Sequence, residues 1–282
     1  MDLDQALANL ARQPDCGLDV AEVALLLARD EYPALDVEGY LSEIQAMAHE
    51  ARNYVRGGLE ARVGGLCRYL FHEMGFRGNQ EDYYDPHNSY LNQVLERRLG
   101  IPITLSAVMM AIGQRAGLNL VGIGLPGHFI VKASNPPSPS GRAAAGDGVL
   151  IDPFNGGRIL SLEDCEALVQ RATGTPFNLS PLELAPVPTG LIVRRMLNNL
   201  KSIYVKQEDW PRSIRVLERL RQVDPDNVPL RRDLGICYLR RHQPGKAIDL
   251  LQSYLDNAAE ADDIDTIRQM HRAAVRMVAQ WN

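Results

Sequence analysis

The chain has 282 residues, of which 45% are hydrophobic, 23% charged and 6% aromatic. These fractions are close to those of soluble globular domains, and they exclude a disordered, collagen-like or disulfide-rich chain. Lys and Arg number 30 against 35 Asp and Glu, a formal charge of −5, so no overall basic field draws the chain to nucleic acid or anionic lipid. At roughly 100–200 residues per domain, the length predicts about two units.

The cysteine spacing and the N-terminal segment indicate a cell compartment. The four cysteines, Cys16, Cys67, Cys165 and Cys237, lie far apart and form no CxxC pair, which argues against a zinc knuckle or a disulfide framework. No apolar run approaches the ~18 residues of a membrane helix, and the N-terminal segment lacks the basic start of a signal peptide. We therefore expect a cytoplasmic protein with no membrane attachment, no metal and no cofactor.

Charge is unevenly distributed along the chain. Residues 1–189 carry 14 basic and 23 acidic side chains, a charge of −9, whereas residues 190–282 carry 16 basic and 12 acidic ones, a charge of +4. The basic residues of the second segment come in isolated pairs such as Arg194-Arg195, without the interleaved aromatics of a nucleic-acid stripe. They predict a solvated helical face or a surface for acidic peptides, and no binding of nucleic acid.

Residues 1–75 form the first of three predicted regions, and the pattern there is helical. Apolar residues are dense between Leu18 and Leu27, and Asp19 is in position to cap that helix. Farther on, Ile44 and Met47 continue an amphipathic spacing of three and four residues. This region is therefore expected to consist of helices alone.

The second predicted region, residues 76–189, combines helices with strands. Helices are expected over about residues 90–99 and 104–116, the second after Pro102, which suits a first helical turn. Strand-like runs follow at residues 118–123, 128–133 and 149–152, with a turn between the first two and a loop rich in Pro, Gly, Ser and Ala at residues 134–148. Helices followed by consecutive strands predict an α+β fold with an antiparallel sheet.

The third predicted region, residues 190–282, contains an internal repeat. Shifting the chain by 34 residues places Tyr204 on Tyr238. This is the tetratricopeptide period, a helix–turn–helix unit that stacks on its neighbours to bury its apolar face. In the second copy, Gly235 and Ala247 fall where small residues let two helices approach, and residues 264–281 are predicted to form a capping helix. A generic helical bundle is the alternative.

Two residues of the predicted sheet suggest a catalytic arrangement. His128 starts the second strand and Asp152 ends the third, so antiparallel pairing would bring their side chains together. An imidazole oriented by a carboxylate is the base and orienter of a catalytic triad. The nucleophile would then lie upstream, at the N-terminus of a helix packed on the sheet, where the helix dipole lowers the pKa of a thiol.

The order of these residues resembles the transglutaminase-like branch of the papain-like fold, in which Cys opens a helix and His and Asp follow on adjacent strands. Two segments carry a narrower resemblance, NSYLNQVLERRLGIPITLSAVMMAIGQRAGLNLVGIGLPGHFIV and LIDPFNGG, together with the tetratricopeptide-like helices after them. With these segments the chain resembles the bacterial SirB-type family of transglutaminase-like proteins. The resemblance covers most of the chain. It implies a helix-and-sheet core, an all-α tail and a cytoplasmic protein.

One element of the family pattern is missing. The family cysteine would lie within residues 102–106, where the chain has none and where Thr104 and Ser106 are the only hydroxyls. A hydroxyl is less nucleophilic than a thiolate and needs an adjacent base. His128 and Asp152 therefore match the family pattern, and the nucleophile does not.

Each of these residues also has a structural interpretation. His128 can bond a loop carbonyl, Asp152 can initiate a turn, Thr104 can cap a helix and Ser106 can pack inside it. Cys67 lies in an apolar helical pattern that predicts a small buried residue. It could reach His128 only if the N-terminal helices fold over the site.

An acidic loop ahead of the first core helix is one further candidate site. Asp82, Asp85 and His87 carry donor atoms that suit a divalent ion. No further ligand stands at the ordinary spacing, and loops of this kind often cap the helix that follows. We expect no metal at this loop.

The leading hypothesis from the sequence is a non-catalytic transglutaminase-like fold that binds a protein or peptide, with the helical repeats as the interaction surface. The alternative is a cysteine-less hydrolase or acyltransferase acting on amide bonds through Thr104 or Ser106, with His128 as base and Asp152 as orienter. A third hypothesis treats the whole chain as a scaffold in which His128 and Asp152 pin the hairpin.

Overall fold

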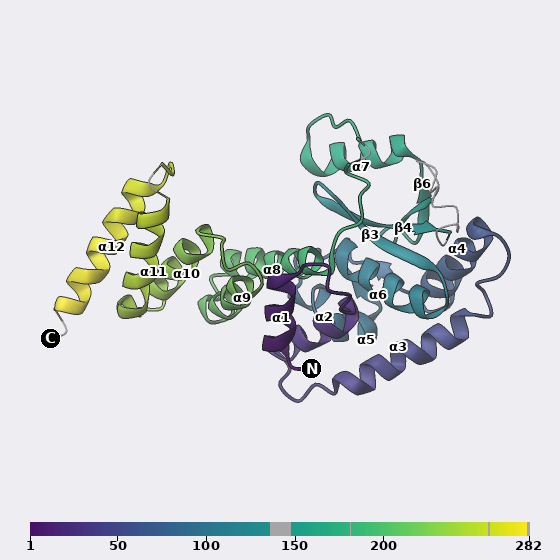
Figure 1. The fold of residues 1–282 in the computed structure, drawn as a ribbon, viewed down its shortest axis with the longest axis horizontal. Helices are drawn as coiled ribbons and strands as arrows, with labels where there is room; N and C mark the ends of the chain where they lie inside the picture. The colour runs from purple at the N-terminus through teal and green to yellow at the C-terminus, as the bar shows by residue number, and fades with distance from the viewer. Residues whose placement is uncertain (136–147, 181, 259, 281–282) are drawn as a thin grey trace. The chain divides into compact units, whose positions relative to one another are not determined.

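The computed structural model describes residues 1–135, 148–180, 182–258 and 260–280, and the chain forms two compact units (Figure 1). The larger unit is Gly17–Val193, and the smaller one consists of Met1–Cys16 together with Arg194–Asn282. The predicted fold class, an α+β core with an all-α repeat tail, is confirmed. Residues 1–75, grouped together from the sequence, are shared between the two units.

The larger unit starts with helices and continues with a sheet. Its elements are α2 (Val20–Ala28), α3 (Val37–Ala51), α4 (Leu59–Cys67), the π-helical turn η1 (Arg68–Glu73), β1 (Arg77–Gly78), the 3-10 turn η2 (Pro86–Asn88), α5 (Leu91–Arg97), β2 (Leu99–Gly100), α6 (Pro102–Arg115), β3 (Asn119–Leu125), β4 (His128–Ser134), β5 (Val149–Asp152), β6 (Arg158–Leu160) and α7 (Leu162–Thr173). β1 and β2 form a separate, parallel pair.

The main sheet is antiparallel with the strand order β3-β4-β5-β6. Val131 of β4 pairs with Ile151 of β5, and Ile151 pairs in turn with Ile159 of β6. The three predicted strands are present. β6 was not predicted, because a strand of three residues is too short to show an alternating pattern. Residues 136–147, within the predicted loop, lie outside the described residues.

Helices α6 and α7 lie on opposite faces of this sheet (Figure 1). Every residue of α6 from Pro102 to Gly113 is buried, as expected for a helix that is apolar on all sides. On the other face, Leu168 and Val169 of α7 pack into a cluster that includes Ile130 of β4. The sheet is therefore covered on both faces, and its strand ends hold the candidate site.

The N-terminal helices of the larger unit follow the predicted pattern. Asp19 caps α2 by accepting a hydrogen bond from the Ala21 N–H at 2.9 Å.

α4 is closely packed at Gly65, where a Cβ atom would lie 2.0 Å from the Tyr54 carbonyl oxygen. The preceding Gly64 differs, because a Cβ atom there would meet nothing within 4 Å.

The smaller unit is helical. Its elements are α1 (Leu3–Arg12), the main part of α8 (Thr189–Lys206), α9 (Trp210–Val223), α10 (Pro229–Arg240), α11 (Pro244–Asn257) and α12 (Ile264–Ala279). Gly235 has the predicted role, because a Cβ atom there would lie 2.7 Å from the Leu251 side chain. Ala247 is fully buried. These small residues allow α10 and α11 to pack closely.

The first helix of the chain packs against the repeat helices, which the sequence did not predict. α1 buries Ala6, Leu7 and Leu10 and contacts α9. Asp4 and Arg219 add an ion pair at 2.6 Å. α1 thus extends the apolar core of the smaller unit.

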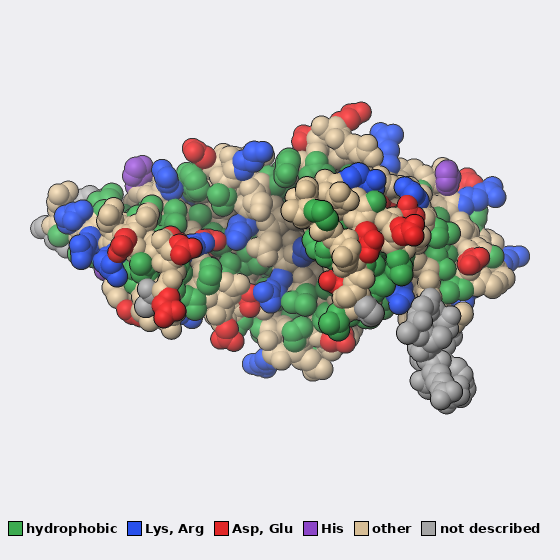
Figure 2. All heavy atoms as spheres, turned by 90° about the horizontal axis from the view of Figure 1, so that it is seen from above, with side chains coloured by type: hydrophobic (Ala, Val, Ile, Leu, Met, Phe, Trp, Pro, Cys, Tyr) green, Lys and Arg blue, Asp and Glu red, His purple; other side chains and the backbone are tan. Residues whose placement is uncertain are grey.

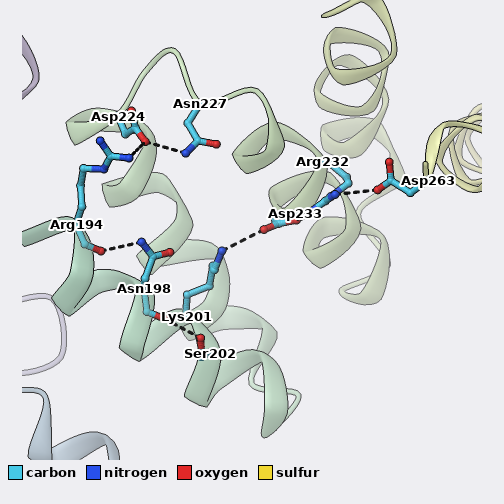
Figure 3. A network of polar contacts seen from close by, with 9 residues as sticks. All are labelled: Arg194, Asn198, Lys201, Ser202, Asp224, Asn227, Arg232, Asp233 and Asp263. Carbon is cyan, nitrogen blue, oxygen red and sulfur yellow. Dashed lines mark hydrogen bonds and ion pairs between the residues drawn. The ribbon is translucent and has the colours of Figure 1, made fainter. Parts of the chain in front are cut away.

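A network of ion pairs links the repeat helices (Figure 3). Lys201 of α8 contacts Asp233 of α10 at 3.3 Å, and Arg232 reaches Asp263, which precedes α12, at 2.8 Å. Arg194 pairs with Asp224 at 2.6 Å. Arg194 and Arg232, two of the basic residues expected on a solvated face, are thus partly buried and ion-paired.

The adjacent glycines of α4 provide a matched test of this packing. Gly65→Ala should lower the free energy of unfolding by about 1–3 kcal/mol, because the new methyl group meets a backbone carbonyl that cannot rotate away. Gly64→Ala should leave it unchanged or raise it by up to about 1 kcal/mol, since alanine favours the helix. Urea unfolding followed by circular dichroism measures both, and equal effects would contradict the packing at Gly65.

Candidate functional site

The predicted pair of His128 and Asp152 is assembled where β4 begins and β5 ends. The His128 Nε2 atom lies 3.0 Å from Asp152 Oδ1. Asp152 is fully buried, and 8% of His128 is exposed. The antiparallel order of β4 and β5 brings the two residues together from positions 24 apart in the chain.

The Asp152 carboxylate also organises the turn that follows it. Its Oδ1 atom accepts hydrogen bonds from the Phe154 N–H at 3.1 Å and the Asn155 N–H at 3.3 Å, and its Oδ2 atom accepts one from Asn155 Nδ2 at 2.6 Å. Burial alone would raise the pKa of Asp152, but the hydrogen bonds from His128 and Asn155 outweigh it, and the pKa lies below its ordinary value. The carboxylate is therefore ionised at neutral pH.

Phe154 lies beside the imidazole of this pair. The two rings meet edge to face, with centroids 6.1 Å apart and planes at 83°. The same ring approaches Tyr83, at 6.0 Å between centroids, and a Cβ atom on Gly78 would come within 2.6 Å of it. The Phe154 ring therefore occupies the space between β1 and His128.

The two hydroxyls at the start of α6 are engaged elsewhere. Thr104 Oγ1 donates to the Asn88 carbonyl at 2.8 Å and accepts from the Ile101 N–H at 3.1 Å, so it caps the helix. Ser106 Oγ lies 3.5 Å from the Phe129 carbonyl. Both side chains are fully buried, and in the described part of the chain neither hydroxyl hydrogen-bonds the imidazole.

Cys67 lies closer to this site than its sequence position suggested. A Cβ atom on Gly157 would lie 2.8 Å from Cys67 Sγ, so the thiol adjoins the turn that follows Asp152. Burial raises the pKa of the Cys67 thiol to about 12. The thiol is therefore protonated at neutral pH and is a poor nucleophile.

Two cavities flank the turn between Asp152 and Arg158. One, of about 660 Å³, lies against α4 and η1, and the other, of about 580 Å³, lies against β1 and the residues after it. Asn155 lines both. The sequence analysis did not single out Phe154 or Asn155, although an Asn in a Gly-containing turn after Asp152 is a recognisable signal for side-chain capping.

The acidic loop is held in place by contacts within the loop and with α5. Asp85 bonds His87 Nδ1 at 2.6 Å and pairs with Arg97 at 2.8 Å. Burial raises the pKa of Asp85, but these hydrogen bonds lower it more, and it lies below its ordinary value. Within the described residues, no group of three or more His, Cys, Asp or Glu side chains is placed to hold a metal ion.

Two further observations concern nucleic-acid and membrane partners. On the face shown in Figure 2, basic and acidic side chains are interspersed, and the described residues there form no continuous basic stripe. None of the helices in the described ranges has the length and apolar character needed to cross a bilayer.

Comparison with known families agrees with this architecture. A family model described as the transglutaminase-like superfamily matches residues 38–198, and one described as the tetratricopeptide repeat matches residues 200–272. The chain therefore belongs to the transglutaminase-like superfamily, with tetratricopeptide repeats after the core. The resemblance found in the sequence is confirmed at this level.

Its bacterial relatives carry the name UPF0162 protein. The one from Xylella fastidiosa strain Temecula1 is 37% identical over 273 aligned positions, with 92% of this chain and 91% of that protein covered. The one from Vibrio cholerae is 29% identical, with 84% of this chain and 86% of that protein covered. F-box only protein 21 of Homo sapiens is 30% identical over 57% of this chain but only 22% of its own length. No solved structure gave a significant match.

Removing the imidazole should destabilise the larger unit. His128→Ala leaves a buried carboxylate without one of its partners, so the free energy of unfolding should fall by about 2–4 kcal/mol. His49→Ala, at an exposed position of α3, should change it by less than about 0.5 kcal/mol. Equal effects in urea unfolding would show that the His128–Asp152 bond is not a structural contact.

The lowered pKa of Asp152 predicts a pH dependence. A carboxyl whose pKa is depressed in the folded state stabilises it at pH values above the unfolded pKa, and that stabilisation is lost as the pH falls through the folded pKa. Asp152→Asn should therefore be much less stable than the wild type at pH 7, and the difference should narrow between about pH 5 and pH 2. Parallel curves of unfolding free energy against pH would contradict this.

Proposed function

We propose that the chain is a non-catalytic protein-interaction module, in which a transglutaminase-like core is joined to a helical-repeat surface. The partner is a protein or peptide, and neither nucleic acid nor a membrane is expected as a partner. A cytoplasmic location is part of the proposal, because all four cysteines are free, as is usual for proteins of a reducing compartment.

The observation that carries the proposal is that the hydroxyl groups of both candidate nucleophiles, Thr104 and Ser106, hydrogen-bond groups other than His128. Thr104 Oγ1 is used in capping α6, and Ser106 Oγ points to a backbone carbonyl. A hydroxyl nucleophile needs a base within about 2.6–3.2 Å. With Phe154 beside the imidazole and a protonated thiol at Cys67, the site supports binding better than covalent chemistry.

The repeat helices offer an accessible surface for the partner. Asn198 and Ser202 are exposed on α8, and each bonds only a carbonyl of the preceding helical turn, Arg194 O and Asn198 O respectively. Helical repeats present extended surfaces of this kind to peptides and proteins. Both residues can be replaced without breaking the ion pairs between helices, which Figure 3 shows alongside them.

A second candidate function rests on the intact His128–Asp152 bond. In a hydrolase or acyltransferase acting on amide bonds, the imidazole would serve as base and the carboxylate as orienter. Thr104 or Ser106 would first have to leave its present hydrogen bonds and approach His128. This alternative predicts a modified or cleaved partner, whereas the non-catalytic function predicts an unchanged one.

Capture of partners by the full-length chain, quantified by mass spectrometry, tests both functions. Asn198→Glu/Ser202→Glu should lose the partners recovered by the wild type, because it places bulk and charge on α8. Gln252→Glu/Asn257→Glu is the matched control: it makes the same charge change on α11 at two exposed residues that also bond within their own helix. It should retain the partners.

The mass of the captured partner distinguishes the two functions. Incubation with the wild type and with His128→Ala should leave the same intact mass. A cleaved or altered product that forms with the wild type and is absent with His128→Ala would establish the enzyme instead. Recovery of the same partners by both double variants would exclude the α8 surface.

A further inference from the structure

The cavity between α4 and the Asp152 turn has an unusual lining. It measures about 660 Å³. One wall is formed by α4 and η1, and the other by the turn after Asp152 and the first residue of β6. The lining residues are Gly64, Cys67, Arg68, His72, Asn155, Gly156, Gly157 and Arg158. We call it the Arg68–Arg158 pocket.

The lining of the Arg68–Arg158 pocket is basic in an acidic part of the chain. It contains two arginines and a histidine and no acidic side chain, although residues 1–189 carry a charge of −9. Arg68 pairs with Glu73 and Arg158 with Asp164, and both acids lie outside the lining. Exposed ion pairs of this kind are weak, so each guanidinium remains available to a further anion.

Gly64 keeps the pocket open at a cost to the helix. A glycine within a helix is destabilising unless packing requires it. Packing requires Gly65, which faces the Tyr54 carbonyl, but nothing lies within 4 Å of a Cβ atom on Gly64. The missing side chain at Gly64 therefore leaves room in the pocket and has no packing role in the described structure.

The backbone and hydrogen bonds of the two walls also indicate a binding site. Arg68 and His72 lie on the π-helical turn η1, and such turns occur frequently at functional sites. On the opposite wall, Asn155 donates its amide to Asp152. A group bound in the pocket would thus contact Asn155, whose side-chain amide donates a hydrogen bond to the Asp152 carboxylate.

We propose that the Arg68–Arg158 pocket binds the carboxylates of an acidic segment in the partner protein. The proposal rests on the interaction function above and names the place where the larger unit holds its partner. A guanidinium presents paired N–H donors that match a carboxylate in a bidentate arrangement. Two arginines on opposite walls suit a segment with more than one acidic side chain.

A labelled hexaglutamate peptide is the probe, titrated by fluorescence anisotropy into the full-length protein. Arg68→Gln/Arg158→Gln should weaken its binding about tenfold or more, since two charge-assisted contacts are lost. Gly64→Leu should weaken it comparably by filling the pocket, with no change in charge. Arg29→Gln/Arg56→Gln removes the same charge from exposed positions outside the lining and should bind within about twofold of the wild type.

Three results would overturn this assignment. The first is equal weakening by both arginine double variants, which would show a general charge effect. The second is wild-type binding by Gly64→Leu with the folded circular dichroism spectrum of the wild type. The third is an absence of hexaglutamate binding to the wild-type protein. In the capture experiment, retention of the partners by the pocket variants would rule out only the pocket. Capture of no partner by the wild type would rule out the interaction function itself.

Discussion

A buried carboxylate is the constraint on which the larger unit depends. Asp152 is fully buried at the end of β5, and a charge in that position requires hydrogen-bond donors around it. His128, Phe154 and Asn155 supply them. The same bonds fix the turn, hold the Phe154 ring against Gly78 and bring the Gly157 backbone to Cys67. One charge thus fixes the turn that forms one wall of each of the two cavities.

The proposed function gives a structural role to the His128–Asp152 pair, which resembles the base and orienter of a triad. Breaking its bond would leave a buried charge without one of its hydrogen-bond donors, and the hydroxyls of Thr104 and Ser106 bond backbone groups of other segments. The interactions that stabilise the larger unit around this pair therefore require no nucleophile. We infer that binding surfaces on both units carry the function, with the basic pocket of the core as one of them.

Local patterns in the sequence were sufficient for much of this architecture. The 34-residue period located the repeat helices, alternating apolar runs located β3 to β5, and antiparallel order alone predicted the meeting of His128 and Asp152. Contacts between distant segments were missed, because periodicity carries no information about them: α1 against α9, Cys67 beside Gly157, and Phe154 beside His128. The proximity of Arg68 and Arg158 belongs to this second class, and so the pocket could not be predicted.

The docking of α1 on α9 has a consequence for synthesis of the chain. Arg219 is translated 215 residues after Asp4, its partner in the ion pair. During that interval α9, against which α1 packs with its apolar stripe of Ala6, Leu7 and Leu10, is still incomplete, and at roughly 5–20 residues per second the wait is on the order of 10–40 seconds. The core unit, whose residues lie entirely between the two, can fold in that time. The smaller unit is therefore completed last, after its first helix has waited for α9.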